Sequence, residues 1–254
     1  MDYVPLEQVK NAKGLRLVLV KGMPSPWGQA AKTMFEMKGV PYICAPQLPG
    51  EPNEDLVAWS GQGGGPVVAW EDEKPIHHWL DILFLAERIA PEPRLVPEDA
   101  RDRAWMIGLS HEICGEGGIG WSRREMMFAP AIQSGKAPDA VKTMAKRYKF
   151  DENSAGKAAQ RAAGSLGVLA DQLKAQKAQG RRYFIGDSVT ALDIYWTAFA
   201  VLLAPPPDDI CPIPPSYRPG FEAIGPELQK ALDPALLEHR DFIFESYFRC
   251  PMEY

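Results

Sequence analysis

The chain has 254 residues, a length that predicts two domains. Its apolar fraction of 46% and charged fraction of 24% are ordinary for soluble globular proteins and exclude disorder or a fibrous architecture. Acidic and basic residues are interspersed, and the formal net charge is -5. A clustered basic surface is therefore missing, and we expect no nucleic-acid partner.

The N-terminal segment MDYVPLEQVKNAKG lacks the basic-then-apolar order of a signal peptide, and the most apolar stretch, Ile194 to Ala204, is too short to span a bilayer. We therefore expect a cytoplasmic protein with no membrane partner. Cys44, Cys114, Cys211 and Cys250 form neither a C-x-x-C pair nor a zinc-ligand spacing. This pattern predicts reduced, mostly buried thiols and no bound metal.

The first ninety residues alternate between strand and helix patterns. Leu15 to Val20 (LRLVLV) is typical of a strand buried on both faces, and MPSPWGQAAKTMFEMKG has a helical period that ends at Gly39. Further elements are predicted in chain order: a strand over Val40 to Ala45, a short helix over Asn53 to Ser60, a strand over PVVAW from Pro66, a brief fourth strand at Pro75 and Ile76, and a helix over His77 to Ile89. The predicted order is β-α-β-α-β-β-α.

The remainder of the chain is predicted to be helical. Pro91, Pro93 and Pro97 mark a linker, which gives domains at 1–90 and 99–254 joined by residues 91–98. One long helix, weakened by glycines, is predicted over Trp105 to Phe128, and an amphipathic helix over Lys157 to Ala178. Pro205 to Pro219 is predicted to be a proline-dense loop before one or two terminal helices.

A capping box is predicted at Thr190-Ala191-Leu192-Asp193. The Thr190 side chain would accept from the third helical N–H, while Asp193 reaches back to the N–H of the cap residue. Val189 and Ile194 have the spacing of the hydrophobic staple that accompanies such a box. The helix it opens is apolar nearly all round and should run through the middle of the second domain. Such a cap is worth about 1 kcal/mol.

Ser25 directly precedes Pro26, the preferred pairing of a capping residue with proline at the first helical position. From spacing alone, a simple helix cap is the better supported interpretation. The position also favours function, because a helix N-terminus concentrates unpaired N–H groups and positive potential that stabilise an anion such as a thiolate. A hydroxyl there would add a direct hydrogen bond to the sulfur.

The glycine-rich turn before Pro66 is not predicted to be a phosphate loop, and the group His77, His78 and Asp81 is not predicted to be a metal site. The glycine-rich turn before Pro66 lacks the G-K-[ST] ending and precedes its strand. On sequence alone the bond to Pro66 is expected to be trans, since only about 5% of X-Pro bonds are cis. His77, His78 and Asp81 share a helical spacing but lack further ligands, so they are expected to be polar residues facing a cleft.

Several large apolar side chains are candidates for a ligand pocket. Trp27, Trp121, Met126, Met127 and Phe128 lie near the predicted starts of helices or within them. Core packing explains such residues at helical spacing at least as often as a pocket does. The sequence leaves both interpretations open.

Three segments together resemble the cytosolic glutathione transferase superfamily, and the resemblance spans nearly the whole chain. They are SPWGQAAKTMFEMKGVPY, where members place a catalytic Ser, Cys or Tyr; GPVVAW before an acidic turn, where members have a cis-proline; and YFIGDSVTALDIYW, which matches the F-I-x-G-D-x-x-T-x-x-D cap segment of the central helix. The resemblance implies a thioredoxin-like α/β N-terminal domain and an all-α C-terminal domain. It also implies glutathione as co-substrate and a homodimer.

The resemblance implies a role for individual residues. Ser25 would activate the glutathione sulfur, and the backbone at Gly65-Pro66 would pair with the cysteinyl part. The implied glutathione-binding residues are Ser25, Trp27, Gly65, Pro66, Val67, His77 and His78, and the implied substrate pocket contains Met23, Trp121 and Met127. One departure is that His77-His78, followed by Trp79, stands where members carry Glu/Gln-Ser for the γ-glutamyl group.

The chemistry that follows is attack by the glutathione thiolate on a small hydrophobic or aromatic electrophile, as in a detoxifying transferase or a glutathione-dependent lyase. Hydrogen-bond donation from Ser25 would lower the pKa of the thiol, and no general base is needed. Two alternatives stay open. One is a module that holds glutathione without turnover, and the other is a scaffold of the same fold that docks partners through the loop Pro205 to Pro219.

Overall fold

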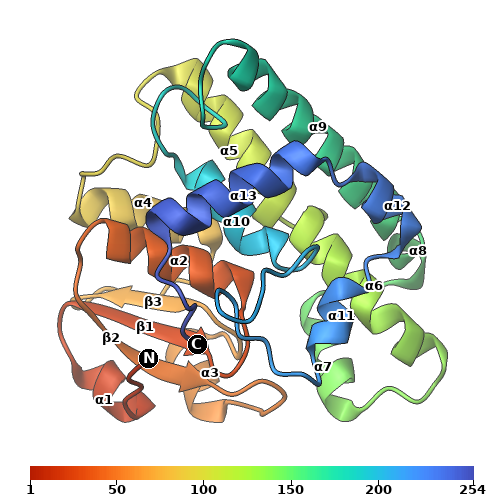
Figure 1. Ribbon diagram of the computed structural model, residues 1–254. Helices are drawn as coiled ribbons and strands as arrows, with labels where there is room; N and C mark the ends of the chain where they lie inside the picture. The colour runs from red at the N-terminus through yellow and green to blue at the C-terminus, as the bar shows by residue number, and fades with distance from the viewer.

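The computed structural model describes residues 1–254 and shows two units that pack against each other (Figure 1). A small sheet with its flanking helices, coloured red to orange in Figure 1, lies below a larger array of helices. The predicted fold, a thioredoxin-like unit followed by a helical unit, is confirmed. No helix combines the length and apolar character needed to cross a membrane.

The N-terminal unit contains α1 (Leu6–Asn11), β1 (Leu15–Val20), α2 (Pro26–Met37), β2 (Tyr42–Gln47), α3 (Glu54–Ser60), β3 (Val67–Trp70) and α4 (Trp79–Ile89). The helical unit contains α5 (Ala100–Cys114), α6 (Ile119–Gln133), α7 (Asp139–Arg147), α8 (Glu152–Ala155), α9 (Ala158–Ala178), α10 (Ala191–Ala200), α11 (Arg218–Glu222), α12 (Gly225–Ala231) and α13 (Pro234–Tyr247). No helix or strand interrupts residues 90–99. The domain boundaries proposed from the sequence remain predictions.

The sheet has the order β2-β1-β3, with β1 parallel to β2 and antiparallel to β3. Leu15 pairs with Tyr42 on one side and with Trp70 on the other. Both faces of β1 are buried, because Leu17 packs in a cluster with residues of α2 and α4, whereas Val18 packs with residues of α1 and α3. This double burial explains why the strand is an unbroken apolar run.

Two predicted features of the secondary structure are wrong, and one further helix, α1, was missed. The fourth strand is only an isolated bridge between Ile76 and Val68. The long helix expected over residues 105–128 is two helices, α5 and α6, because the chain turns sharply at the glycines between them. Gly117 has a φ of 82°, and a Cβ at Gly118 would lie 2.5 Å from the backbone oxygen of Glu112. Glycine permits both the conformation and the close approach.

Helix α10 forms the centre of the helical unit, and all of its residues are buried. Thr190 and Asp193 form the predicted capping box, in which the Thr190 N–H donates to the Asp193 carboxylate at 2.8 Å. Val189 and Ile194 are buried in one hydrophobic cluster, as the predicted staple requires. The segment expected to run through the middle of the second unit therefore does so.

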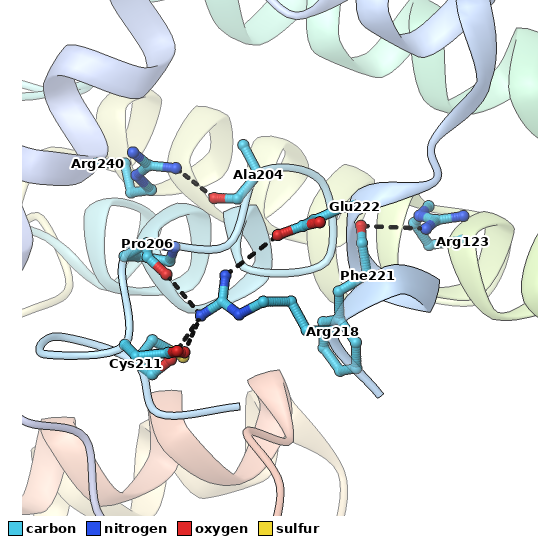
Figure 2. A network of polar contacts seen from close by, with 9 residues as sticks. Arg123, Ala204, Pro206, Cys211, Arg218, Phe221, Glu222 and Arg240 are labelled. Carbon is cyan, nitrogen blue, oxygen red and sulfur yellow. Dashed lines mark hydrogen bonds and ion pairs between the residues drawn. The ribbon is translucent and has the colours of Figure 1, made fainter. Parts of the chain in front are cut away.

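Arginines hold the proline-dense loop between α10 and α11 against the helical unit (Figure 2). Arg218 Nη2 donates to the carbonyl of Pro206 at 3.1 Å, and Arg240 on α13 donates to the carbonyl of Ala204. Arg123 on α6 donates to further carbonyls on either side of the loop. Buried carbonyl groups need such partners where no regular structure supplies them. The loop is thus anchored by contacts within the chain.

The two units meet where α2 and α4 pack against the helices of the second unit. The Trp27 ring contacts Phe199 of α10 edge-on, with 4.6 Å between ring centroids, and its Nε1 donates to the Cys114 carbonyl at 3.0 Å. The Tyr195 hydroxyl on α10 donates to the Trp79 carbonyl at 3.0 Å. These contacts join the start of α2 and the start of α4 to the helical unit, and so define the walls of a cleft.

Candidate functional site

A cleft of about 320 Å³ lies between the two units. The thioredoxin-like unit contributes Trp27, Gln62, Gly64, Gly65, Pro66, His77, His78 and Trp79, and the helical unit contributes Cys114, Gly115, Glu116, Trp121, Arg147 and Tyr148. A pocket at the junction of two units, with mixed aromatic and polar walls, is the usual place for a small-molecule site. We therefore take this cleft as the candidate site.

The segment Gly65-Pro66 lies in the wall of the cleft that the sheet contributes. The bond between these residues is cis, so the trans bond expected from sequence alone is wrong. A Cβ at Gly65 would lie 3.1 Å from the Val18 oxygen and 3.3 Å from the Val20 nitrogen, and glycine therefore allows this segment to press against β1. The segment immediately precedes β3.

Aromatic rings form the opposite wall. Tyr148 stands at their centre, with its ring centroid 5.1 Å from that of Trp121, 5.9 Å from that of Trp27 and 5.8 Å from that of Phe128. Edge-to-face and tilted contacts between aromatic rings are favourable, and they hold the rings in fixed orientations. The wall presents a rigid apolar surface to any ligand that enters the cleft.

Charged groups in the cleft are few. Glu116 is paired with Lys149, whose Nζ lies 3.0 Å from both carboxylate oxygens. Arg147, at the end of α7, forms no ion pair, and the one hydrogen bond from its guanidinium is a weak one from Nη1 to the Met144 sulfur at 3.7 Å. Burial lowers the pKa of Arg147, but a guanidinium stays protonated at neutral pH. The cleft therefore contains one uncompensated positive charge.

The thiol of Cys114 is the one cysteine sulfur belonging to a residue of the cleft wall. Complete burial raises the pKa of this thiol well above its ordinary value. A protonated thiol is a poor nucleophile. The cysteine at the cleft is thus structural, as the sequence predicted for the cysteines in general, and Cys44 and Cys211 are buried as well.

The structure brings most of the predicted site residues together in the cleft. Those that line it are Trp27, Gly65, Pro66, His77, His78 and Trp121. Four others do not: Ser25, Met23, Val67 and Met127. Val67 follows Pro66, but its side chain packs on the far face of the sheet with Val9 and Val18, as the alternation of a strand requires. Met127 lies beside Gly220 instead of the cleft.

Ser25 stands at the N-cap of α2, where it was predicted, and is 8% exposed. Its hydroxyl forms no capping hydrogen bond with the helix. The residue lies two positions before Trp27, which does line the cleft. The side chain thus does not act as the simple helix cap that spacing alone favoured.

Sequence reasoning missed eight of the cleft residues as site residues: Arg147 and Tyr148, and also Gln62, Gly64, Trp79, Cys114, Gly115 and Glu116. Arg147 and Tyr148 are the two that come from the end of α7, a helix that was not predicted, and they meet the cleft only because α7 folds back over the glycine-rich turn. The guanidinium lies directly over Gly64, where a Cβ would be 2.7 Å from Arg147 Nη1. The run of glycines before Pro66 was a visible signal that something approaches the backbone there.

A larger depression, of about 870 Å³, lies between the start of α5 and the end of α9. Its walls come from the helical unit alone, and they consist mostly of polar side chains around Trp105. It includes neither the cis-proline segment nor the start of α2. The smaller cleft between the units is the better candidate because it joins residues from both units around one unpaired charge.

Comparison with solved structures identifies the fold. A glutathione S-transferase from Methylobacillus flagellatus, solved with glutathione bound, matches with a TM-score of 0.62 at 14% identity, over 92% of this chain and 99% of that chain. One from Methylobacterium radiotolerans, in complex with glutathione sulfonate, matches with a TM-score of 0.56 at 17% identity, over 89% and 94%. Glutathione transferase Omega 3C from Trametes versicolor gives 0.54 at 19% identity, over 92% of each chain.

No protein-family model and no curated protein matches the sequence. The likeness therefore rests on the arrangement of the elements, which extends over nine-tenths of the chain in each comparison just described. The chain has the fold of the glutathione transferases.

Proposed function

We propose that the protein binds glutathione in the cleft between its two units and uses the thiolate of the tripeptide as a nucleophile. The observation that carries this proposal is the Gly65-Pro66 segment, which lines the cleft between the two units immediately before β3. An extended peptide can bind beside a strand end through main-chain hydrogen bonds. Glutathione or its sulfonate occupies solved structures of the same fold, which supports the choice of ligand.

The nucleophile in this proposal comes from the ligand. The Cys114 thiol is held protonated by burial, so the cleft wall offers no thiolate of its own. Bound glutathione would supply the sulfur, and an electrophile would lie against the aromatic wall around Tyr148. With an aryl halide, a sulfur–carbon bond forms, the carbon–halogen bond breaks, and the halide leaves with the electron pair. The thiol proton goes to solvent before attack.

Ser25 is proposed to donate a hydrogen bond to this sulfur from the start of α2. The absence of a capping hydrogen bond leaves its hydroxyl free for such a role. The N-terminus of α2 adds the positive end of the helix dipole, which also favours the anion. The proposal requires the sulfur to reach the edge of the cleft next to Trp27, two residues along the chain.

Replacing Ser25 with alanine is expected to lower the rate of conjugation of glutathione to chlorodinitrobenzene by tens-fold, in line with the loss of one transition-state donor. The affinity for glutathione, measured by calorimetry, should change little. Ser134→Ala, which alters an exposed serine at the end of α6, is the matched control and should leave both quantities unchanged. An unchanged rate in Ser25→Ala would remove this residue from the mechanism.

A second candidate function is binding of glutathione without turnover. The placement of Ser25 favours it, because this residue is mostly buried and does not line the cleft. The exposed pair His77-His78 would then serve recognition of the tripeptide alone. Calorimetric binding of glutathione together with no turnover across a panel of aryl halides, epoxides and unsaturated carbonyl compounds would select this function over the first.

A further inference from the structure

The guanidinium of Arg147 is the only charged group lining the cleft that has no partner of opposite charge. It comes from α7 in the helical unit and projects over the glycine-rich turn of the other unit. Both carboxylate oxygens of the nearby Glu116 accept hydrogen bonds from Lys149 Nζ. An unpaired cation in a partly desolvated site is costly unless a ligand supplies the anion.

The chain makes room for this guanidinium at a specific place. A Cβ at Gly64 would lie 2.7 Å from Arg147 Nη1 and 3.1 Å from its Cζ, and a Cβ at Gly63 would lie 3.4 Å from Nη2. A side chain at Gly64 would have to displace the guanidinium, whereas one at Gly63 would only come into contact with it. The consecutive glycines thus allow a planar, five-donor group to lie in the cleft, which is the group best suited to bidentate binding of a carboxylate.

The surroundings of Arg147 indicate which molecule carries that carboxylate. The next residue, Tyr148, is the centre of the aromatic wall, with Trp121 and Trp27 at 5.1 Å and 5.9 Å between ring centroids. Arg147 and these rings line the same cleft, so a ligand ring that packs on this wall shares the cleft with the guanidinium. Aromatic surface and positive charge adjoin on one short segment of the helical unit.

We propose that Arg147 binds a carboxylate on the electrophilic co-substrate, whose aromatic or other planar part packs against the wall formed by Tyr148, Trp121 and Trp27. The preferred electrophile is therefore an anion with a carboxylate close to its reactive ring, in place of a neutral hydrophobic compound. This inference rests on the proposed function, since the electrophile shares the cleft with glutathione.

The test uses two ready-made products, the glutathione conjugates of chlorodinitrobenzene and of chlorodinitrobenzoate, which differ only in a ring carboxylate. Calorimetry on the intact protein is expected to show that the carboxylated conjugate binds about 10- to 100-fold more tightly, the range for hydrogen bonds to a charged group. Arg147→Met should abolish this preference. Arg147→Lys should keep part of it, because the charge remains but the planar fork is lost.

Lys146→Met is the matched control, since it removes the same charge from the neighbouring exposed position of α7 and does not touch the cleft. It should leave the preference intact. Equal binding of the two conjugates by the unaltered protein, or a preference that survives in Arg147→Met, would overturn the inference.

The affinity for glutathione itself separates this inference from two other outcomes. If Arg147→Met weakens glutathione and both conjugates by the same factor, the arginine binds a carboxylate of the tripeptide, and the assignment to the co-substrate is wrong. If the unaltered protein binds neither glutathione nor either conjugate, the proposed function fails and the inference fails with it. Binding of all three with no carboxylate preference overturns the inference alone.

Discussion

Replacing Asp193 with alanine is expected to lower the free energy of unfolding by about 3–5 kcal/mol. The carboxylate is fully buried and accepts four hydrogen bonds: from the Thr190 N–H at 2.8 Å, the Thr190 hydroxyl at 2.9 Å, the Phe184 N–H at 3.0 Å and His239 Nε2 at 2.8 Å. Alanine would leave these donors buried without a partner. The loss is larger than the roughly 1 kcal/mol of a simple cap, because Asp193 also joins the start of α10 to α13.

Urea unfolding followed by circular dichroism measures this change. Asp187→Ala is the matched control, since that carboxylate is exposed and pairs only loosely with Arg181, at 3.4 Å. The free energy of unfolding of the control should differ from that of the unaltered protein by no more than about 0.5 kcal/mol. A loss of 1 kcal/mol or less in Asp193→Ala would show that the buried network adds nothing beyond the helix cap.

Replacing Arg123 with methionine is expected to cost about 3 kcal/mol of stability. This arginine is 1% exposed and has no carboxylate partner. Its Nε donates to the Leu202 carbonyl at 2.9 Å, and its Nη2 donates to the Gly220 carbonyl at 2.9 Å. Nη2 also donates to the Phe221 carbonyl at 3.4 Å (Figure 2). Burial lowers its pKa to about 10, so the group is still cationic at neutral pH. Methionine fills the volume but leaves the carbonyls unpaired.

The neighbouring position supplies the control for this prediction. Arg124 is similarly buried, but it donates only to the Met127 sulfur at 3.8 Å, and its Nε has no partner. Arg124→Met should therefore change stability by less than about 1 kcal/mol, since no backbone carbonyl loses a donor. Thermal unfolding of both variants gives the comparison. Equal losses would show that the carbonyl contacts of Arg123 do not hold the loop between α10 and α11.

Local sequence patterns were sufficient to predict those elements that have a distinctive apolar run or capping motif. Leu15 to Val20 is a strand because both of its faces are buried, and the box at Thr190 and Asp193 marks the start of α10 to the residue. Short or interrupted elements were harder. Helix α1 has six residues, of which only Val9 is buried, so its periodic signal is weak. The break between α5 and α6 depends on a close backbone approach at Gly118 that periodicity does not register.

Most of the site residues that the thioredoxin-like unit contributes could be predicted from the sequence, whereas Arg147, from the helical unit, could not. Gly65, Pro66 and His77 are close in the chain, and the resemblance to a known fold assigned them to one place. Arg147 lies seventy or more residues further along the chain and reaches the cleft through the path of α6 and α7. No local pattern distinguishes it from any other arginine at the end of a helix. Only its position over Gly64 does so.

The ionisation of glutathione bound to the unaltered protein tests the account most directly. Thiolate absorbs ultraviolet light more strongly than thiol, and S-methylglutathione, which cannot ionise at sulfur, provides the baseline. We expect the pKa of the bound thiol to be at least about one unit lower than that of the free tripeptide, since a hydroxyl donor and a helix N-terminus favour the anion. A bound thiol that titrates together with free glutathione, or the absence of saturable binding, would contradict the proposal.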